Sequence, residues 1–292
     1  MYYQIENDEL IIRAETAGAQ LKSVYSKKTN TEYLWQGDEK YWKGRAYNIF
    51  PIVGRAFEGK YDMYDKTYEI RAHGVARYRD FDLIERSATK LVFRLKYNAE
   101  TLKSYPCKFV FYVIYRLCGC KLSVTYKVEN ADDKAIAFCL GGHPGFNVPF
   151  DGGSFNEYYL QFDEKTPVRQ RLLAPSKLMS KESKVYPLDE NARIHLSHAM
   201  FDDDAVVLEN TCRRVTLCRA DGKRAIAIAY DDFRYLGLWH TPQTDAPFVC
   251  VEPWTGLPST DGERFDLMKK EDADRLAPQT SKEVSFSVEI HE

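Results

Sequence analysis

The sequence lacks the features that mark membrane proteins and nucleic-acid-binding proteins. Its longest hydrophobic run, Phe109–Tyr115, is far shorter than the roughly 20 residues that a helix needs to cross a bilayer. The N-terminus has no basic segment followed by an apolar one. Neither sign of charge dominates, because 41 Lys and Arg face 43 Asp and Glu, whereas a phosphate-binding face normally leaves a domain strongly cationic. We therefore expect a cytoplasmic protein with no membrane or nucleic-acid partner.

Cysteine pairs with metal-binding spacing are absent as well. The seven cysteines are an odd number and include no Cys-x-x-Cys motif. Four of them sit inside apolar or alternating runs, which favours buried, reduced thiols over a disulfide or a zinc site. We expect no metal and no cofactor.

Helical periodicity is also scarce, since even the two best candidates, Ala99–Ser104 and Leu267–Leu276, are short and highly charged. Aromatic and β-branched residues are abundant, and they alternate with polar residues at the spacing of strands with one buried face. The clearest hairpin joins Cys107–Leu117 to Cys120–Asn130. Further strand candidates are Glu9–Ala14, Ala19–Tyr25, Ala135–Leu140, Tyr158–Phe162, Val206–Glu209, Phe248–Val251 and Val284–Ile290.

Two more hairpins complete the pattern. Arg213–Ala220 and Lys223–Tyr230 flank an Asp-Gly pair, which supplies the positive φ angles of a tight hairpin turn. Phe81–Glu85 and Leu91–Tyr97 flank a short polar segment. No linker, repeat or shift in composition divides the chain. The sequence thus predicts an all-β protein, a large antiparallel β-sandwich with few short helices, in one domain of residues 1–292.

Four segments carry polar groups that a pure scaffold does not require, and each also has a structural interpretation. Arg55 ends a nonpolar stretch, where its planar cation could hold two hydroxyls or an oxyanion, or simply form a surface ion pair. His73 precedes a glycine that would let a ligand approach closely. His143 lies in Gly-Gly-His-Pro-Gly, which we expect to be a rigid loop. Glu252 ends an apolar strand, where a carboxylate is costly to bury without partners or a function.

A fifth segment adds Trp239 and His240, and the tryptophan is either a core residue or a face that stacks on a pyranose. Two histidines, a glutamate, an arginine and a tryptophan together suit proton transfer on a carbohydrate without a cofactor. A zinc site competes with this interpretation, because two histidines and a carboxylate are also a ligand set. No His-x-His or His-Glu-x-x-His spacing supports it.

The chain resembles the aldose 1-epimerases, or mutarotases, of the galactose mutarotase-like group, and most closely their short bacterial branch of LacX type. The resemblance covers nearly the whole chain and rests on the ordered motifs FPIVGR, HG, GGHPGFNVP, FDDDAVVLEN, LGLWHTP and VCVEPWTGLPS. Its most specific part is GGHPGFNVP followed by CVEPW. The resemblance implies a galactose mutarotase-like super-sandwich with an open cleft for a small sugar on one sheet. We expect a monomer or homodimer.

Residue by residue, the resemblance implies that Glu252 is the general base and that His143 is the general acid. The residues that it implies for sugar binding are Arg55, His73, Asp202 and Trp239. Asp204 remains the alternative to Asp202, because the family's aspartate falls within an Asp-Asp-Asp run. The predicted function is aldose 1-epimerase activity.

The chain also departs from the better-known galactose enzymes. They have an asparagine where this chain has Gly54, and they have different residues after the catalytic glutamate. This departure leaves the acid–base pair intact but leaves the identity of the aldose open. Some relatives act on hexose 6-phosphates through extra basic residues, for which Arg77, Arg79 and Lys60 are candidates here.

Exchange of anomers requires one group that removes the C1 hydroxyl proton and one that protonates the ring oxygen. With reference pKa values of about 4.3 and about 6.5, Glu252 would be ionised at neutral pH, and nearby carboxylates would keep His143 protonated. The main rival is a carbohydrate-binding module, in which the same cleft binds sugar without turnover. The next rival is a glycoside hydrolase, in which Glu252 and Asp202 would flank the scissile bond.

Overall fold

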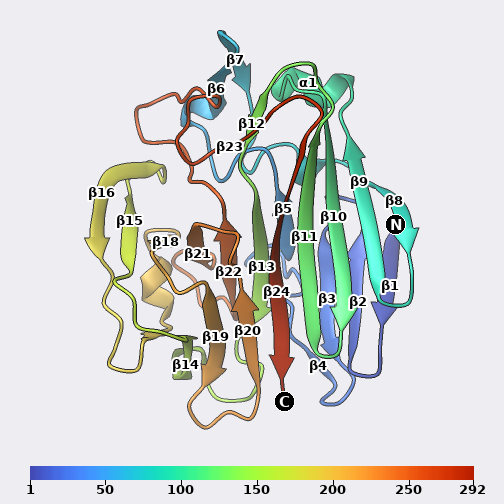
Figure 1. Ribbon diagram of the computed structural model, residues 1–292. Helices are drawn as coiled ribbons and strands as arrows, with labels where there is room; N and C mark the ends of the chain where they lie inside the picture. The colour runs from blue at the N-terminus through green and yellow to red at the C-terminus, as the bar shows by residue number, and fades with distance from the viewer.

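The computed structural model describes residues 1–292 and consists mainly of antiparallel strands (Figure 1). The largest sheet has nine strands, in the order β17 (Arg193–His195), β14 (Tyr158–Phe162), β19 (Arg214–Arg219), β20 (Ala225–Ala229), β24 (Ser281–His291), β11 (Lys121–Asn130), β10 (Phe109–Cys118), β9 (Lys90–Lys96) and β8 (Asp82–Arg86). The second sheet has seven strands, in the order β16 (Met179–Val185), β15 (Arg169–Leu173), β18 (Val206–Glu209), β21 (Tyr235–Trp239), β22 (Phe248–Trp254), β13 (Gly141–Asn147) and β5 (Ala46–Ile49).

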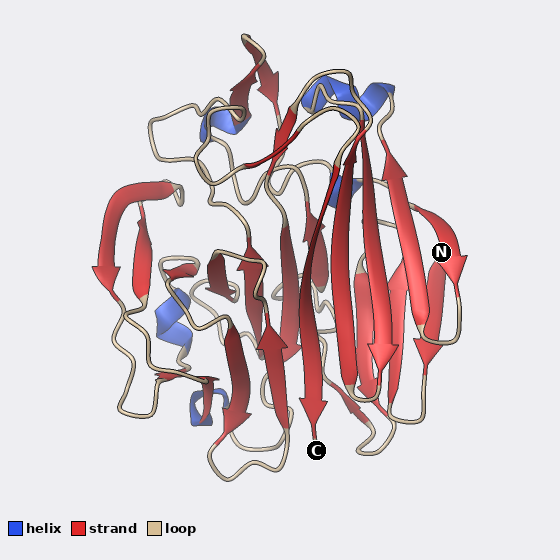
Figure 2. Cartoon of the chain, in the orientation of Figure 1, coloured by secondary structure: helices blue, strands red, loops and turns tan.

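Smaller elements surround these two sheets. A four-stranded sheet is formed by β1 (Tyr2–Glu6), β2 (Leu10–Glu15), β3 (Leu21–Ser26) and β4 (Thr31–Glu32). Two ribbons are formed by β6 (Lys60–Met63) with β7 (Lys66–Glu69) and by β12 (Ile136–Phe138) with β23 (Asp274–Leu276). Helix is confined to short pieces at the margins (Figure 2): α1 (Ala99–Ser104) and the 3₁₀ turns η1 (Phe57–Gly59), η2 (Ala76–Tyr78), η3 (Phe155–Glu157) and η4 (His198–Phe201).

The nine-stranded and seven-stranded sheets pack face to face. A Cβ on Gly142 of β13 would lie 2.8 Å from the ring of Phe286 on β24 and 3.2 Å from the hydroxyl of Tyr126 on β11. Tyr126 in turn donates a hydrogen bond of 2.8 Å to Asn48 Oδ1 on β5. Seventy-five buried residues form one continuous hydrophobic cluster. The predicted antiparallel β-sandwich is confirmed. One face of β13 is directed toward the core between the two sheets.

All three predicted hairpins are present. In β10–β11 the register runs from Phe109 opposite Asn130 to Cys118 opposite Lys121, so period-two alternation over ten residues per strand identified the pair correctly. The hairpins β19–β20 and β8–β9 also form. These pairs are local in sequence, which is why their pattern could be recognised without the rest of the fold.

One of the two helix candidates is wrong. Helix α1 has the predicted bounds, because the Asn98 side chain accepts hydrogen bonds from the N–H groups of Glu100 and Thr101 and caps its first turn. The segment Leu267–Leu276 forms turns and then the short strand β23, which pairs with β12. Tertiary pairing overrides a weak helical pattern in a charged segment.

The cysteines form no disulfide. All seven are free thiols, as predicted, but only Cys107, Cys139 and Cys250 are buried. Cys118 lies exposed at the end of a hairpin strand, where alternation turns every second residue to solvent. The expectation of buried thiols therefore holds for the residues that face a core.

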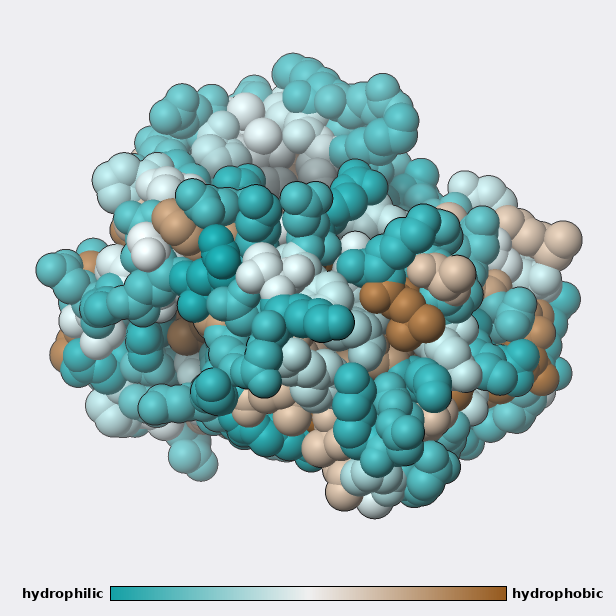
Figure 3. Space-filling view, turned by 90° about the horizontal axis from the view of Figure 1, so that it is seen from above, coloured by the Kyte–Doolittle hydropathy of each residue, from teal (hydrophilic) through white to brown (hydrophobic).

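The surface seen from above is mostly hydrophilic, with hydrophobic residues scattered in small areas (Figure 3). The exposed large hydrophobic side chains are Met1, Tyr2, Ile84 and Val185. Isolated apolar residues of this kind are normal on protein surfaces. None of the helices is both long and apolar enough to span a membrane.

Candidate active site

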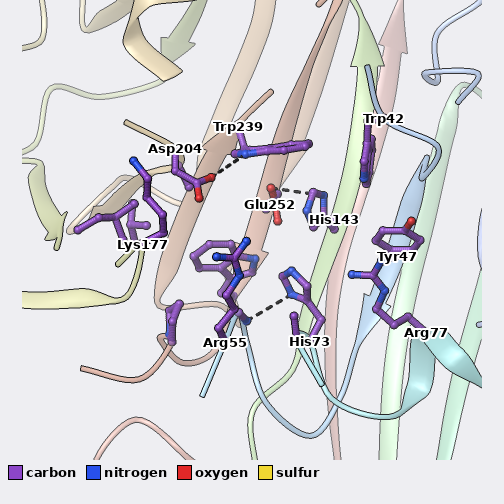
Figure 4. Close-up of a pocket in the computed structure, with 17 residues that line it drawn as sticks. Trp42, Tyr47, Arg55, His73, Arg77, His143, Lys177, Asp204, Trp239 and Glu252 are labelled. Carbon is purple, nitrogen blue, oxygen red and sulfur yellow. Dashed lines mark hydrogen bonds and ion pairs between the residues drawn. The ribbon is translucent and has the colours of Figure 1, made fainter. Parts of the chain in front are cut away.

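A cavity of about 290 Å³ lies on the seven-stranded sheet, on the face that points away from the nine-stranded sheet (Figure 4). The residues that line it are Trp42, Tyr47, Gly54, Arg55, Ala72, His73, Arg77, His143, Leu173, Lys177, Asp204, Ala205, Val207, Trp239, Glu252, Trp254 and Pro258. Five of the residues predicted for the site are among them: Arg55, His73, His143, Trp239 and Glu252. The sheet thus collects side chains from segments that are far apart in the sequence.

Glu252 and His143 lie opposite each other on neighbouring strands. The register of β13 and β22 pairs Gly141 with Trp254 and Gly145 with Cys250, so His143 falls across from Glu252. Side chains directly opposite on antiparallel strands have Cβ atoms only about 5 Å apart. Accordingly, His143 Nδ1 lies 3.4 Å from Glu252 Oε1. The two groups lie side by side in the cavity lining, so one ligand could contact both of them.

Two prolines interrupt the strand ladder around this pair. Pro144 and Pro253 lack the N–H group that ladder pairing needs, and β13 and β22 form no ladder pairs at the positions between Gly141 and Gly145. Both strands nevertheless continue, because their other edges pair with β5 and β21. The predicted loop around His143 is therefore wrong: this segment is a central strand. A strand positions an imidazole more rigidly than a loop does.

Aromatic side chains form the walls beside the pair. Trp42 stacks on the imidazole of His143 with 4.8 Å between ring centroids and 25° between ring planes. Trp42 also contacts Trp239 edge to face, with centroids 5.5 Å apart. Trp254 lies over Gly237, where any Cβ would approach its ring to 2.7 Å. Glycine at this position leaves the space that the indole occupies.

Burial governs the protonation of the central pair, since Glu252 is 1% exposed and His143 is 7% exposed. Burial raises the pKa of Glu252 well above its usual range, and the charge of Asp204 adds to this while the indole N–H of Trp254 opposes it. Burial lowers the pKa of His143 well below its usual range, and Arg77 acts in the same direction. Both shifts run against the expectation of an ionised Glu252 beside a protonated His143. Burial thus disfavours the charged form of each group.

His73 is a neutral hydrogen-bond donor on the cavity wall. Its Nδ1 accepts the N–H of Gly54 at 3.3 Å, and its backbone N–H donates to the Gly54 carbonyl at 2.7 Å. Burial, with help from Arg77 and Arg55, lowers the pKa of His73 to about 3. Because Nδ1 accepts a hydrogen bond in a neutral ring, Nε2 carries the proton. The ring meets His143 edge to face, with centroids 5.4 Å apart.

Three cationic side chains line the cavity, and none of them forms an ion pair: Arg55, Arg77 and Lys177. The guanidinium carbon of Arg77 lies 3.6 Å from the ring centroid of Tyr47, a cation–π contact that fixes its position. Lys177 Nζ donates to a backbone carbonyl at 3.1 Å, and the Arg55 side chain is exposed. These cations are available to a polar or anionic ligand.

Asp204, and not Asp202, is the aspartate that lines the cavity. Asp202 is exposed and lies outside it, which corrects the preference drawn from the sequence. Asp202 ends the turn η4 in a helical conformation, whereas Asp204 has a φ of 91° that redirects the chain. Asp204 Oδ1 accepts a hydrogen bond of 2.8 Å from Trp239 Nε1. Sequence spacing could not separate two aspartates within one turn.

His240 does not line the cavity, although it follows Trp239. It is fully buried, and its ring packs against Phe201 with centroids 4.3 Å apart. Its Nδ1 donates to the Thr241 carbonyl at 2.8 Å, and its Nε2 accepts from His198 Nδ1 at 3.1 Å. Burial lowers the pKa of His240 to about 4. This histidine is a structural residue.

Acid should destabilise the protein through His240. An unfolded histidine titrates at about 6.5, whereas the folded His240 has a pKa of about 4. Between these values the unfolded chain binds more protons, so the free energy of unfolding falls as the pH falls, by about 1 kcal/mol per pH unit. We expect His240→Gln to flatten this fall in urea titrations. The exposed His195→Gln is the control, and equal pH slopes for His240→Gln and wild type would contradict the assignment.

Sequence reasoning missed several residues of the cavity. Tyr47 lies opposite His143 in the β13–β5 pair, and Lys177 comes from a turn, so no local motif marks either. Trp254 could have been found, because it follows Glu252 by two positions in the same strand and shares its face. Of the basic residues considered for a phosphate, Arg77 lines the cavity, whereas Arg79 and Lys60 do not.

Comparisons with known proteins agree with this fold. The chain matches the aldose 1-epimerase family over residues 1–259. It is 30% identical over 299 residues to the chromosomal protein LacX of Lactococcus lactis subsp. lactis, which covers 99% of each chain. The structure of a galactose mutarotase related enzyme from Lactobacillus acidophilus has a TM-score of 0.94 at 33% identity, covering 100% of this chain and 98% of that one. A galactose mutarotase-like protein from Lactobacillus casei has a TM-score of 0.94 at 34% identity, covering 100% of both chains. The chain therefore belongs to the aldose 1-epimerase family.

Proposed function

We propose that this protein is an aldose 1-epimerase, which interconverts the α and β anomers of an aldose by opening and closing the ring. The observation that carries the proposal is the 3.4 Å contact between His143 and Glu252 in the cavity. His143 Nδ1 and Glu252 Oε2 have no hydrogen-bond partner in the protein. An unpaired buried polar atom costs about 1–3 kcal/mol. A sugar hydroxyl and a ring oxygen would satisfy both atoms.

The proposed reaction moves two protons and breaks one bond. Glu252, as carboxylate, takes the proton of the C1 hydroxyl while the bond between C1 and the ring oxygen breaks, and His143, as imidazolium, gives a proton to that oxygen. C1 is then an aldehyde, and rotation about C1–C2 presents its other face. On closure Glu252 returns its proton to O1, and His143 takes one from the attacking oxygen. No electrons are transferred, so the chemistry needs no cofactor.

The proton count of the pair agrees with this mechanism. A carboxylic acid beside a neutral imidazole and a carboxylate beside an imidazolium hold the same number of protons. In the first form the carboxyl group donates and a ring nitrogen accepts, and in the second form these two roles are reversed. Burial favours the neutral form of both groups. In the proposed reaction the pair has this neutral form when the ring is open and the sugar is an aldehyde, because Glu252 has then taken a proton and His143 has given one up. The 3.4 Å between His143 Nδ1 and Glu252 Oε1 is short enough for small movements to exchange the proton.

Other lining residues would hold the sugar over the pair. The Nε2–H of His73 and the Arg55 guanidinium are donors for hydroxyls. The indole faces of Trp42 and Trp239 are suited to stack on the C–H face of a pyranose. Asp204 orients Trp239 through its 2.8 Å hydrogen bond.

Polarimetry of freshly dissolved aldoses tests the proposal. We expect faster mutarotation than the spontaneous rate for at least one aldose or aldose 6-phosphate. Sugar binding without any acceleration would favour a carbohydrate-binding module. Release of reducing sugar from glycosides would favour a hydrolase, in which Asp204 would replace Asp202 as the second carboxylate beside Glu252.

A hexose-6-phosphate 1-epimerase is the second candidate. The observation in its favour is the group of three cations in the cavity without ion-pair partners: Arg55, Arg77 and Lys177. A phosphate carries close to two negative charges and several acceptor oxygens, which arginine in particular binds well. The ratio of kcat/KM for a hexose 6-phosphate to that for the free hexose distinguishes the two substrates.

We expect Arg55→Ala to weaken substrate binding more than it slows the chemistry. Loss of a hydrogen bond from a charged donor costs about 1.5 kcal/mol or more, which raises KM by roughly 10-fold. The kcat should change by only a few fold, because Arg55 does not contact the acid–base pair. Steady-state polarimetry measures both constants, and Lys60→Ala, outside the cavity, is the control. An unchanged KM would remove Arg55 from the binding site.

The two aspartates are expected to differ in the same assay. Asp204→Ala should raise KM by about 10-fold, because it removes the hydrogen bond that orients Trp239. It should also change the tryptophan fluorescence. Asp202→Ala is the matched control from the same turn and should leave KM and fluorescence unchanged. The opposite pattern would restore Asp202 as the sugar-binding aspartate.

A further inference from the structure

A third potential ligand atom lies beside the acid–base pair. The imidazole of His143, the thiol of Cys250 and the carboxylate of Glu252 each offer one donor atom, and these atoms all lie within 4.8 Å of one another. It is the only group of three or more such residues in the chain with this proximity. Cys250 and Glu252 share a face of β22, two positions apart, and His143 faces them from β13.

The burial and the hydrogen bonding of this cluster indicate a ligand. His143 is 7% exposed, Glu252 is 1% exposed and Cys250 is 0% exposed. His143 Nδ1 and Glu252 Oε2 have no partner in the protein. The proposed acid–base reaction accounts for the imidazole and the carboxylate, but it gives the thiol no function.

We propose that a thiophilic divalent cation such as Zn²⁺ or Cd²⁺ binds between His143, Cys250 and Glu252 and inhibits the enzyme. Imidazole nitrogen, thiolate sulfur and carboxylate oxygen are a donor set that zinc prefers and that Mg²⁺ and Ca²⁺ do not. On binding, the Cys250 thiol and the Glu252 carboxyl group release their protons to the solvent.

The geometry requires only a small contraction of the cluster. Bonds of about 2.0 to 2.3 Å in a tetrahedral zinc site place donor atoms about 3.3 to 3.8 Å apart. The donors of this cluster lie within 4.8 Å, and the His143–Glu252 distance is already 3.4 Å. Side-chain movements of about 1 Å complete the site. The fourth position would face the cavity, as in zinc sites that keep one position open to solvent.

The inhibition rests on the proposed function, whereas the binding does not. A cation on His143 Nδ1 and on the carboxylate occupies the lone pairs that the sugar protons need. Mutarotation should therefore stop when the site is filled, and a chelator should restore it. Cys250 has no role in the proton transfers, so Cys250→Ala should keep the mutarotase activity and lose the inhibition.

Binding is measured first, without any sugar. Calorimetric titration of the whole protein with Zn²⁺ should give one tight site, and Co²⁺ should give a thiolate-to-cobalt absorption band. Loss of a group that only hydrogen-bonds to a metal ligand already weakens metal binding about 10- to 100-fold, so loss of the sulfur ligand itself in Cys250→Ala should weaken it by at least about 100-fold. The controls are Cys139→Ala, which removes another buried thiol, and Cys118→Ala, which removes the exposed one.

Each outcome separates the two hypotheses. Tight binding that depends on Cys250 supports the inference, even if no sugar is turned over and the proposed function fails. Absence of a thiolate-to-cobalt band in the wild type, or binding that is lost in Cys118→Ala and kept in Cys250→Ala, overturns the inference and leaves the mutarotase proposal standing. If Cys250→Ala fails to fold, the thiolate-to-cobalt absorption band of the wild-type protein tests the inference by itself.

Discussion

Glu252→Gln is expected to lower the kcat of mutarotation by roughly 10²- to 10⁴-fold, the usual contribution of a general acid or base. Glutamine has nearly the same shape as glutamate, but its amide cannot take the C1 hydroxyl proton or return it. Burial raises the pKa of this carboxyl group and so disfavours its charged form, and a neutral amide is tolerated by the same buried environment. The fold and the sugar affinity should therefore survive the change. Polarimetry measures the rate of mutarotation, circular dichroism tests whether the fold is retained, and calorimetry measures the sugar affinity.

A matched control for this variant is Glu209→Gln. Glu209 lies on β18 of the same sheet, outside the cavity, where it pairs with Arg171 at 3.6 Å. Its replacement should leave kcat within a factor of two or so, since surface ion pairs contribute little to stability. A Glu252→Gln enzyme with full activity would remove Glu252 from the mechanism.

His143→Asn is expected to cause a fall in kcat of the same order. Asparagine has no basic nitrogen, so it can neither protonate the ring oxygen nor accept the proton back. It also loses the stacking contact with Trp42, at 4.8 Å between centroids. KM should rise less than kcat falls, because Arg55 and His73, the proposed donors to the sugar hydroxyls, are unchanged in this variant.

The double variant gives a sharper test of the pair. Residues that act as one catalytic unit show strongly non-additive losses. We therefore expect Glu252→Gln combined with His143→Asn to be about as slow as the slower single variant. If the fold-loss in kcat of the double variant equalled the product of the losses of the two single variants, the two groups would act independently. The control is His195→Asn, because His195 lies exposed on β17 and pairs only with Asp189 at 2.9 Å.

Local pattern was sufficient for most of the strands. Alternation in Phe109–Cys118 and Lys121–Asn130 predicted a hairpin because both partners and their turn lie within one short stretch of chain. Prediction failed where distant segments decide the conformation. A Gly- and Pro-rich segment around His143 has the composition of a loop, yet β5 and β22 hold it as a central strand. The segment Leu267–Leu276 likewise gives up its helical pattern in order to pair with β12.

The candidate site was likewise predicted only in part from the sequence. The resemblance to a family named Glu252, His143, His73, Arg55 and Trp239 as site residues, and all five line one cavity. The aspartate was misassigned, because two positions in a turn separate an exposed carboxylate from one that faces inward. The charges were also misjudged. Reference pKa values describe groups in water, and only the burial of the folded protein lowers the pKa of His143 and raises that of Glu252.

The sequence by itself determined the β-rich architecture and the hairpins, since alternation is a property of neighbouring residues, and its motifs named Glu252 and His143 as candidates for the acid–base pair. The tertiary structure decided which strands pair at long range, and thereby placed Glu252 opposite His143 with Cys250 beside them. The tertiary structure also decided which aspartate lines the cavity and which carboxyl groups are buried away from solvent. These outcomes depend on sheet register and burial, which arise only when segments far apart in the chain are packed against each other.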